Sequence, residues 1–393
     1  MKKLFSSTTV VTGLAIFSML FGAGNLMYPL TVGITSGDQT WLGMLGFFIT
    51  AVCLPVIGLI GMILFDGNYE RFFGRLGKIP GSLMVFICMM IIGPMLAIPR
   101  ITTLSHIMIA PFMPFLNEIN PVNSFIFSLI FLGITFLATY RENKIVEILG
   151  NFISPALLVS LTIIIIKGIW SAQTTTHVTT PPAQIFSENL TRGYETLDLL
   201  GALFFAAIVL NILKNTLGQQ ISQNPRLLAW VGLKAGLLGV ACLGAVYMGM
   251  SFLGAYHGQG LETANAGELF REISFRILGS HGAFIIATAV LMACLSTAIA
   301  LSAVVAEYVQ LTIFRNKVNF VTALLITLVA CIPLSIGGLG QILKLTAGPL
   351  IYVGTPILIA ITLCNILYKL FGFKYIKVPV AVTAILAVLS YFK

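Results

Sequence analysis

Long apolar stretches recur along the whole chain, separated by short segments that carry charged residues, Gly or Pro. An α-helix rises 1.5 Å per residue, so about 20 apolar residues in a row are enough to cross the hydrocarbon core of a bilayer. We read about eleven stretches this way, the last of them short, at residues 9–32, 41–65, 80–110, 123–139, 145–170, 196–213, 227–256, 280–307, 320–336, 342–367 and 378–392. The pattern predicts an all-α polytopic membrane protein with about eleven transmembrane helices.

The composition agrees with a membrane protein and excludes several other classes. Of the 393 residues, 58% are hydrophobic and only 9% are charged, whereas about 25% is the usual charged share in soluble domains. The net charge of +9 suggests nucleic acid as a partner, but the basic residues are scattered between apolar runs and form no stripe. We therefore expect no nucleic-acid partner. The six cysteines are spread through apolar runs without ligand or disulfide spacing, so they read as small core residues.

The distribution of Lys and Arg predicts the orientation of the chain, because loops on the cytoplasmic side retain positive charge. If the N-terminus is cytoplasmic, one side collects most of the basic residues: Lys2, Lys3, Arg71, Arg75, Lys78, Arg141, Lys144, Lys214, Arg226, Arg315, Lys317, Lys369, Lys374 and Lys377. The other side holds only Arg192, Arg271, Arg276 and Lys393. We expect a cytoplasmic N-terminus, with the first apolar run retained rather than cleaved as a secretory signal.

Two interrupted helices divide the chain into halves. The first span contains Gly22, Gly24, Asn25 and Pro29 at its centre, which weakens the helix where lipid makes unpaired backbone groups costly. A polar segment, 171–195, is expected outside the membrane, and the span that follows it has its own interruption near 198–202. Five spans in 9–170 and five in 196–367, running in opposite directions, predict an inverted repeat with a site at the midplane, followed by an extra helix at 378–392. The alternatives are a simple kink and chance, because Gly is common in membrane helices.

Three motifs are similar to a known family in order and spacing. They are Phe-Gly-Ala-Gly-Asn at 21–25 with Pro29 and Gly33, Gly-Pro-Met-Leu-Ala-Ile-Pro-Arg at 93–100, and Ala-Cys-Leu-Ser-Thr-Ala at 293–298 with Glu307. They resemble the bacterial branched-chain amino acid:cation symporters. The resemblance implies uptake of leucine, isoleucine and valine with sodium, or less often protons, on a LeuT-like scaffold of five plus five helices in the bacterial inner membrane. The family pattern has twelve spans, one more than are read here, and it predicts no oligomeric state for this chain.

A zwitterionic substrate needs donors for its carboxylate, acceptors for its ammonium and an apolar pocket for its side chain. The N–H groups of Ala23, Gly24 and Asn25 open the outer half of the first span and suit the carboxylate. The ammonium is expected at the break of the sixth span, on carbonyls near Leu199, Gly201 and Ala202 with Asp198 as a candidate acceptor. Phe204 and Phe205 are candidates for the side-chain pocket or a gate. The plainer alternatives are an interfacial acid for Asp198 and ordinary packing for the two aromatic residues.

A sodium ion takes about five to six hard oxygen ligands. The carbonyl of Ala293 and the hydroxyls of Ser296 and Thr297 lie near one face of the eighth span, because they are three and four positions apart. Resemblance to LeuT-like symporters implies the carbonyls of Ser18 and Phe21 as the partners across the bundle. The alternative is that the two hydroxyls only bond back to carbonyls one turn earlier.

The remaining polar residues are expected to be structural. Arg100 falls about twenty residues into the third span, where it can reach the outer interface, and Glu307 and Lys344 are weaker candidates for proton coupling. The four histidines, His106, His177, His257 and His281, form no ligand spacing and read as loop or interface residues. The sequence has no nucleophile or metal motif of an enzyme and no repeated channel filter. We therefore expect a transporter without a cofactor, with a proton-coupled carrier of another small neutral amino acid or solute as the alternative.

Overall fold

The computed structural model describes residues 7–140, 154–172, 174–175, 177–217, 225–261 and 266–392, and these residues are helical without a strand. The helices are α1 (Ser7–Leu20), α2 (Ala23–Ser36), α3 (Thr40–Phe48), α4 (Leu54–Ile63), α5 (Tyr69–Gly74), α6 (Lys78–Met90), α7 (Ala97–Ile109), α8 (Pro121–Thr139), α10 (Ser154–Trp170), α11 (Pro182–Arg192), α12 (Asp198–Leu217), α14 (Pro225–His257), α15 (Ala266–Tyr308), α16 (Phe320–Ile336), α17 (Leu339–Thr346), α18 (Pro349–Phe371) and α19 (Lys377–Tyr391). Short 3₁₀ and π-helical turns join several of them. The predicted all-α class is confirmed.

Several of the helices are long and apolar enough to span a membrane. Within the described residues, seven helical segments are long and apolar enough to cross a bilayer, or eight if α16 and α17, bent by 103°, count as one span. Three shorter apolar helices, which correspond to α1, α10 and α19, add to these. The beginning of the expected fifth span lies outside the described residues. The expected count of eleven is therefore not confirmed.

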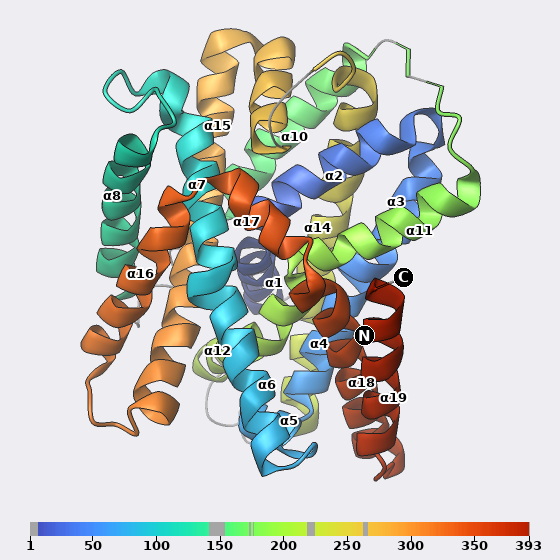
Figure 1. Cartoon of the computed structure of the whole chain (residues 1–393), viewed down its shortest axis with the longest axis vertical. Helices are drawn as coiled ribbons and strands as arrows, with labels where there is room; N and C mark the ends of the chain where they lie inside the picture. The colour runs from blue at the N-terminus through green and yellow to red at the C-terminus, as the bar shows by residue number, and fades with distance from the viewer. Residues whose placement is uncertain are drawn as a thin grey trace.

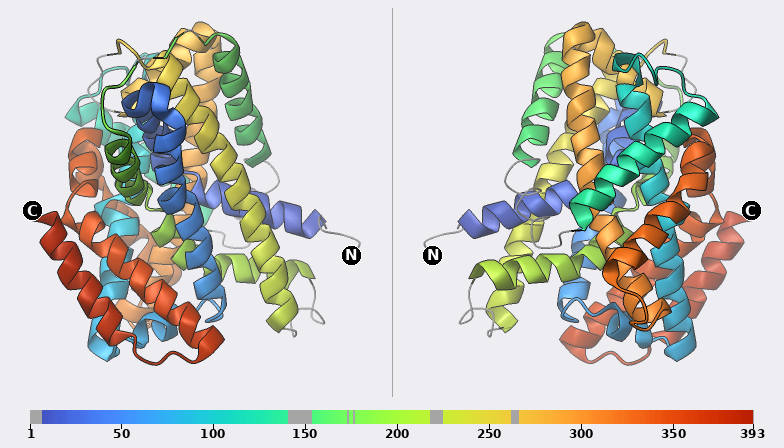
Figure 2. Two further views of the ribbon diagram at one scale, coloured as in Figure 1. Left: turned by 90° about the vertical axis from the view of Figure 1, so that its right-hand side faces the viewer. Right: turned by 90° about the vertical axis from the view of Figure 1, so that its left-hand side faces the viewer.

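The centre of the molecule is formed where α1, α2, α7, α12, α14 and α15 pack together. Figure 1 shows α1 end-on in the middle of the bundle, and Figure 2 shows it lying across the long helix α14. Helices α18 and α19 run side by side along one flank, while α8 and α16 form the opposite flank. Large apolar side chains such as Phe17, Phe21 and Tyr247 are almost fully buried in this centre. Because these side chains are closely packed in the interior, they determine how the central helices pack against one another.

The first span breaks between α1 and α2. Helix α1 ends at Leu20, Gly22 is extended with φ −117° and ψ −161°, and α2 begins at Ala23. The Gly22 N–H donates to Asn25 Oδ1 at 2.9 Å, so a side chain replaces the missing backbone partner. The break predicted from the glycines is therefore present, although Ala23, Gly24 and Asn25 belong to the first turn of α2.

The sixth span also breaks, but upstream of the predicted position. A 3₁₀ turn over Gly193–Thr196 and a left-handed Leu197 (φ 67°) separate α11 from α12. Leu199, Gly201 and Ala202 lie in continuous helix, so the expected interruption at 198–202 is wrong. The polar segment 171–195, expected to be a loop, contains α11.

Helix α11 escaped prediction because its sequence is polar, and a tertiary contact with α3 explains its position. The carbonyl oxygen of Phe186 would lie 2.4 Å from a Cβ at Gly46, so only glycine permits this approach. Asn189 is buried and donates to the Ser36 hydroxyl at 3.2 Å. Backbone contact at glycine thus replaces the apolar face that a membrane helix usually presents.

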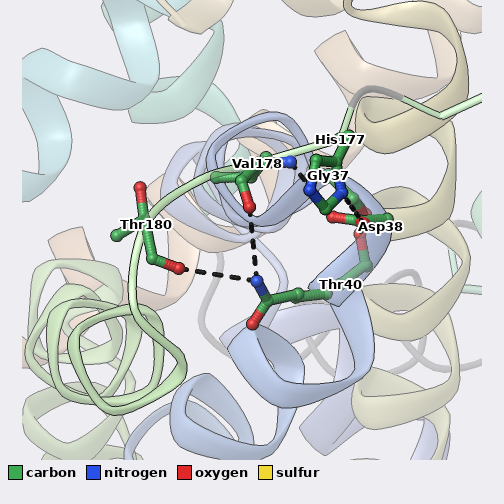
Figure 3. Close-up of polar contacts among 7 residues, drawn as sticks. Gly37, Asp38, Thr40, His177, Val178 and Thr180 are labelled. Carbon is green, nitrogen blue, oxygen red and sulfur yellow. Dashed lines mark hydrogen bonds and ion pairs between the residues drawn. The ribbon is translucent and has the colours of Figure 1, made fainter.

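The segment before α11 is held against the turn between α2 and α3 (Figure 3). His177 Nδ1 lies 2.6 Å from Asp38 Oδ2, and the Val178 N–H donates to Asp38 Oδ1 at 3.2 Å. The Gln39 amide adds bonds of 3.4 Å to the carbonyls of Val178 and Thr180. We call these contacts the 38–178 clasp. It joins the connection between α10 and α11 to the end of the first span.

At the other end of the molecule, one arginine ties α5 to the C-terminal helices. Arg75, which follows α5, donates to Asn365 Oδ1 at 2.9 Å and to the Phe373 carbonyl at 3.0 Å. Its guanidinium also lies 3.9 Å from the centre of the Tyr368 ring. These bonds satisfy polar groups of α18 and of the segment that follows it.

Candidate functional site

The two breaks meet at one small buried cavity of about 30 Å³. Side chains and backbone from α1, α2, α7, α12 and α15 line it: Met19, Leu20, Gly22, Ala23, Asn25, Ile92, Ala97, Arg100, Ile101, Thr196, Leu197, Asp198, Gly201, Phe205, Thr297 and Leu301. A cavity of this size holds at most a few water molecules. Any larger molecule requires the surrounding helices to move apart.

Asp198 is the acidic group of this cavity and begins α12 directly after the second break. Its side chain is only 4% exposed. Asn25 Nδ2 donates to both carboxylate oxygens at 2.8 Å, and the Tyr247 hydroxyl donates to Oδ2 at 2.6 Å. Asn25 and Tyr247 also contact each other. A carboxylate supported by neutral donors keeps its negative charge available for a cation or an ammonium group.

Arg100 is the basic group of the cavity and differs from the expectation for it. The prediction placed it at the outer interface, but the side chain is only 3% exposed. Its Nη1 donates to the Glu195 carbonyl at 2.7 Å and its Nη2 to the Thr196 carbonyl at 3.0 Å. These carbonyls belong to the 3₁₀ turn of the second break, which has lost its helical partners. Arg100 therefore holds the second break in place from α7.

Gly24 provides the space in which Arg100 lies. A Cβ at this position would come within 2.8 Å of Arg100 Nη2 and within 3.2 Å of the Thr196 backbone. Both distances are shorter than ordinary van der Waals contact, so a side chain would push the guanidinium or the break aside. The first turn of α2, α7 and the turn before α12 thus meet at one glycine.

Five buried oxygen atoms gather where α1 ends beside α15. The Thr297 hydroxyl lies 3.1 Å from the Phe21 carbonyl and 3.3 Å from the Ser18 and Ala293 carbonyls. The Ser296 hydroxyl lies 3.0 Å from the Ser18 carbonyl and 2.7 Å from the Ala293 carbonyl. The carbonyls of Ser18 and Phe21 stand at the C-terminal end of α1, where the helix dipole is negative. The spacing argument and the resemblance select the same five groups that the structure brings together.

The predicted substrate residues divide into two groups. Ala23, Asn25, Asp198, Gly201 and Phe205 line the cavity, whereas Gly24 lies against Arg100 just outside it. The others face elsewhere.

Leu199, Ala202 and Phe204 do not line this cavity. Leu199 lines a separate space beside Thr50, and the Phe204 ring stacks on Phe73 with a centroid distance of 6.1 Å. Ala202 is buried in α12. The packing alternative therefore describes Phe204 better than a pocket role does.

The weaker candidates lie away from the cavity. Glu307 and Lys344 are on exposed positions of α15 and α17, and His177 and His281 are exposed. His106 and His257 differ from the expectation of loop positions, because both are buried and bond to the carbonyls of Leu116 and Gly168 at 3.1 and 2.8 Å.

Two groups at the site escaped the sequence argument: Tyr247, which bonds to Asp198, and Thr196, which lines the cavity. Tyr247 lies in an apolar run of α14, where its hydroxyl gave no signal, and Thr196 was placed at the start of a span rather than in a turn. Arg100 did carry a signal, because an arginine inside an apolar segment usually faces the interior of the bundle or a cavity.

A fold with two broken helices facing each other in a helical bundle is that of LeuT-like membrane transporters. A solved structure of MhsT in complex with L-phenylalanine superposes with a TM-score of 0.65 at 16% identity and covers 98% of each chain. This similarity shows the fold of the chain.

Residues 6–393 match the family described as Branched-chain amino acid transport protein, and the chain belongs to that family. The branched-chain amino acid permease BrnQ of Bacillus subtilis is 29% identical over 385 residues, which are 95% of this chain and 84% of that protein. BrnQ of Escherichia coli K12 is 30% identical over 310 residues, 78% of this chain and 69% of that protein.

Proposed function

We propose that this protein imports branched-chain amino acids, leucine, isoleucine and valine, by sodium symport through alternating access in the bacterial cytoplasmic membrane, with a cytoplasmic N-terminus. Family membership supports the substrate class. The observation that carries the coupling is the group of five buried oxygens at the end of α1, next to the Asp198 cavity. Both lie at breaks of opposed helices, as expected for transporters built from inverted repeats.

In this proposal the amino acid occupies a widened form of the central cavity. Its ammonium group contacts Asp198, and its carboxylate faces the first N–H groups of α2 at Ala23 and Gly24, which have no partner within the helix. The apolar side chain lies against Phe205 and Leu301. Widening is required because the cavity of about 30 Å³ is far below the roughly 300–1,000 Å³ of ordinary ligand sites, and alternating access supplies such a movement.

Sodium is assigned to the carbonyls of Ser18, Phe21 and Ala293 and the hydroxyls of Ser296 and Thr297. All are hard oxygen donors, the type that alkali and alkaline-earth cations prefer. Thr297 also lines the central cavity, so the ion and the amino acid would share a wall. This proximity explains how one ligand can favour the other.

A proton-coupled carrier of another small neutral amino acid is the second candidate. The observation that favours it is the buried carboxylate of Asp198 without an ion-pair partner among the described residues. An intramembrane acid of this kind is a common carrier of protons.

The test is uptake of labelled leucine into proteoliposomes, with sodium and proton gradients imposed separately. We expect the sodium gradient to drive uptake. Thr297→Ala should raise the sodium concentration for half-maximal uptake about tenfold or more, because the sodium ion loses the Thr297 hydroxyl oxygen as a ligand. Thr362→Ala is the matched control, since this buried threonine bonds to the Leu358 carbonyl of its own helix. Equal sodium dependence of the two variants would contradict the proposed ion site, and uptake driven by the proton gradient alone would contradict sodium coupling.

A further inference from the structure

The guanidinium of Arg100 is only partly used by the protein. Its two terminal nitrogens bond to the carbonyls of Glu195 and Thr196, but its Nε is buried and has no hydrogen-bond partner. An arginine carries five N–H donors, and a buried donor without a partner costs free energy. Arg100 lines the central cavity, so a ligand in an enlarged cavity has access to donors that the chain itself does not satisfy.

The cavity also contains one charge of each sign, and the two charges do not pair. Both ion pairs among the described residues lie outside the cavity. Arg100 is held by backbone carbonyls of the second break, and Asp198 by the amide of Asn25 and the hydroxyl of Tyr247. Arg100 and Asp198 thus both line the cavity, and each is bonded to its own neutral partners.

We propose that Arg100 and Asp198 together form a clamp for the two ionised ends of a free α-amino acid, Arg100 for the carboxylate and Asp198 for the ammonium. This inference rests on the proposed function and specifies how its substrate class is recognised. It adds Arg100 to the N–H groups at the start of α2 as the carboxylate site. The clamp selects for ligands that carry both charges and against amines, carboxylic acids and amides of the same side chain.

The charge balance explains why such a clamp can stay buried. Each buried charge is costly by itself, but a zwitterion brings one opposite charge to each of them at the same time. Guanidinium and carboxylate fit each other through parallel N–H···O bonds, which a lysine cannot reproduce. Arg100 and Asp198 do not contact the substrate side chain, which lies against the apolar part of the cavity.

The experiment compares leucine with two truncated ligands by thermal-shift titration of the purified full-length protein in nanodiscs. The ligand 3-methylbutylamine lacks the carboxylate, and 4-methylpentanoate lacks the amine. In Arg100→Gln we expect leucine affinity to fall about 10-fold to 100-fold, as for loss of a charge-assisted hydrogen bond. The affinity for 3-methylbutylamine should stay unchanged or rise, because this cation no longer meets a positive charge. The leucine affinity of Arg100→Lys should lie between that of the wild type and that of Arg100→Gln.

Asp198→Asn provides the complementary measurement and keeps the test decisive if Arg100→Gln does not fold. Here leucine affinity should fall by a similar factor, whereas 4-methylpentanoate affinity should not. Arg75→Gln is the matched control, because this arginine lies far from the cavity, and its ligand preferences should equal those of the wild type.

Equal losses for leucine and the truncated ligand in either variant would overturn the clamp and leave a structural role alone. If the wild-type protein binds either truncated ligand as tightly as it binds leucine, the clamp is wrong and the proposed substrate stands. If the wild type binds no branched-chain amino acid, both the proposed function and the clamp fall.

Discussion

Replacing Gly24 by alanine tests the junction of the two breaks with a single methyl group. The added Cβ would lie 2.8 Å from Arg100 Nη2, which is 0.6 Å short of the 3.4 Å at which ordinary contact begins. The end of an arginine can often move away, but this one is fixed by two hydrogen bonds to carbonyls. On the other side the Thr196 backbone lies only 3.2 Å away and cannot yield easily.

The size of the effect follows from these contacts. Overpacking of a filled interior costs about 1–3 kcal/mol, and loosening one bond of a charged donor costs about as much. We expect Gly24→Ala to lower the free energy of unfolding by ~2 kcal/mol and to weaken leucine binding about tenfold or more. Thermal unfolding and leucine titration in the same nanodisc sample measure both quantities.

Gly133→Ala is the control, because Gly133 lies in α8 with nothing within 4 Å of its added Cβ. Alanine is the better helix former by roughly 1 kcal/mol, so this variant should be as stable as the wild type or more so. If Gly24→Ala matches Gly133→Ala in both measurements, the close contact between α2, Arg100 and the second break does not exist in the protein.

Three further predictions concern other contacts. Tyr247→Phe should lower stability by ~1–3 kcal/mol through loss of the hydroxyl on Asp198; a double-mutant cycle with Asp198→Asn that shows no coupling would refute the contact. Asp38→Asn should speed hydrogen exchange of the backbone around His177 with leucine uptake unchanged, and identical exchange would show that the 38–178 clasp is not formed. Arg75→Gln should cost ~1–3 kcal/mol in unfolding without altering leucine affinity, because its bonds tie α5 to α18 far from the cavity; full stability would disprove their contribution.

The first break and the shared helix face of Ala293, Ser296 and Thr297 could be predicted from the sequence because local residue types and spacing determine them. Glycines, an asparagine and a proline inside one apolar run weaken that helix wherever it packs. Likewise, the spacing of Ala293, Ser296 and Thr297 places them on one side of a helix regardless of context. These signals need no knowledge of the partner helices.

The position of the second break and the buried position of Arg100 depend on tertiary contacts and escaped prediction. The turn at Gly193 is fixed by packing, since a Cβ there would lie 1.9 Å from the Thr50 hydroxyl. Arg100 was assigned to the outer interface on the assumption of one straight third span, but that span bends at Gly93 (φ −92°, ψ −116°) between α6 and α7. The bend brings Arg100 to the centre of the bundle, and hydropathy does not record it.

Asn25 joins the two proposed ligand sites through a single side-chain amide. Its oxygen accepts a hydrogen bond from the Gly22 N–H, and its nitrogen donates to Asp198. The Gly22 N–H belongs to the same peptide group as the Phe21 carbonyl, which accepts from the Thr297 hydroxyl. A cation that binds the Phe21 carbonyl and fixes this peptide group would therefore also align the Asp198 carboxylate, which receives the ammonium group of the amino acid. Thermodynamic linkage makes this influence mutual, so the factor by which sodium raises leucine affinity must equal the factor by which leucine raises sodium affinity.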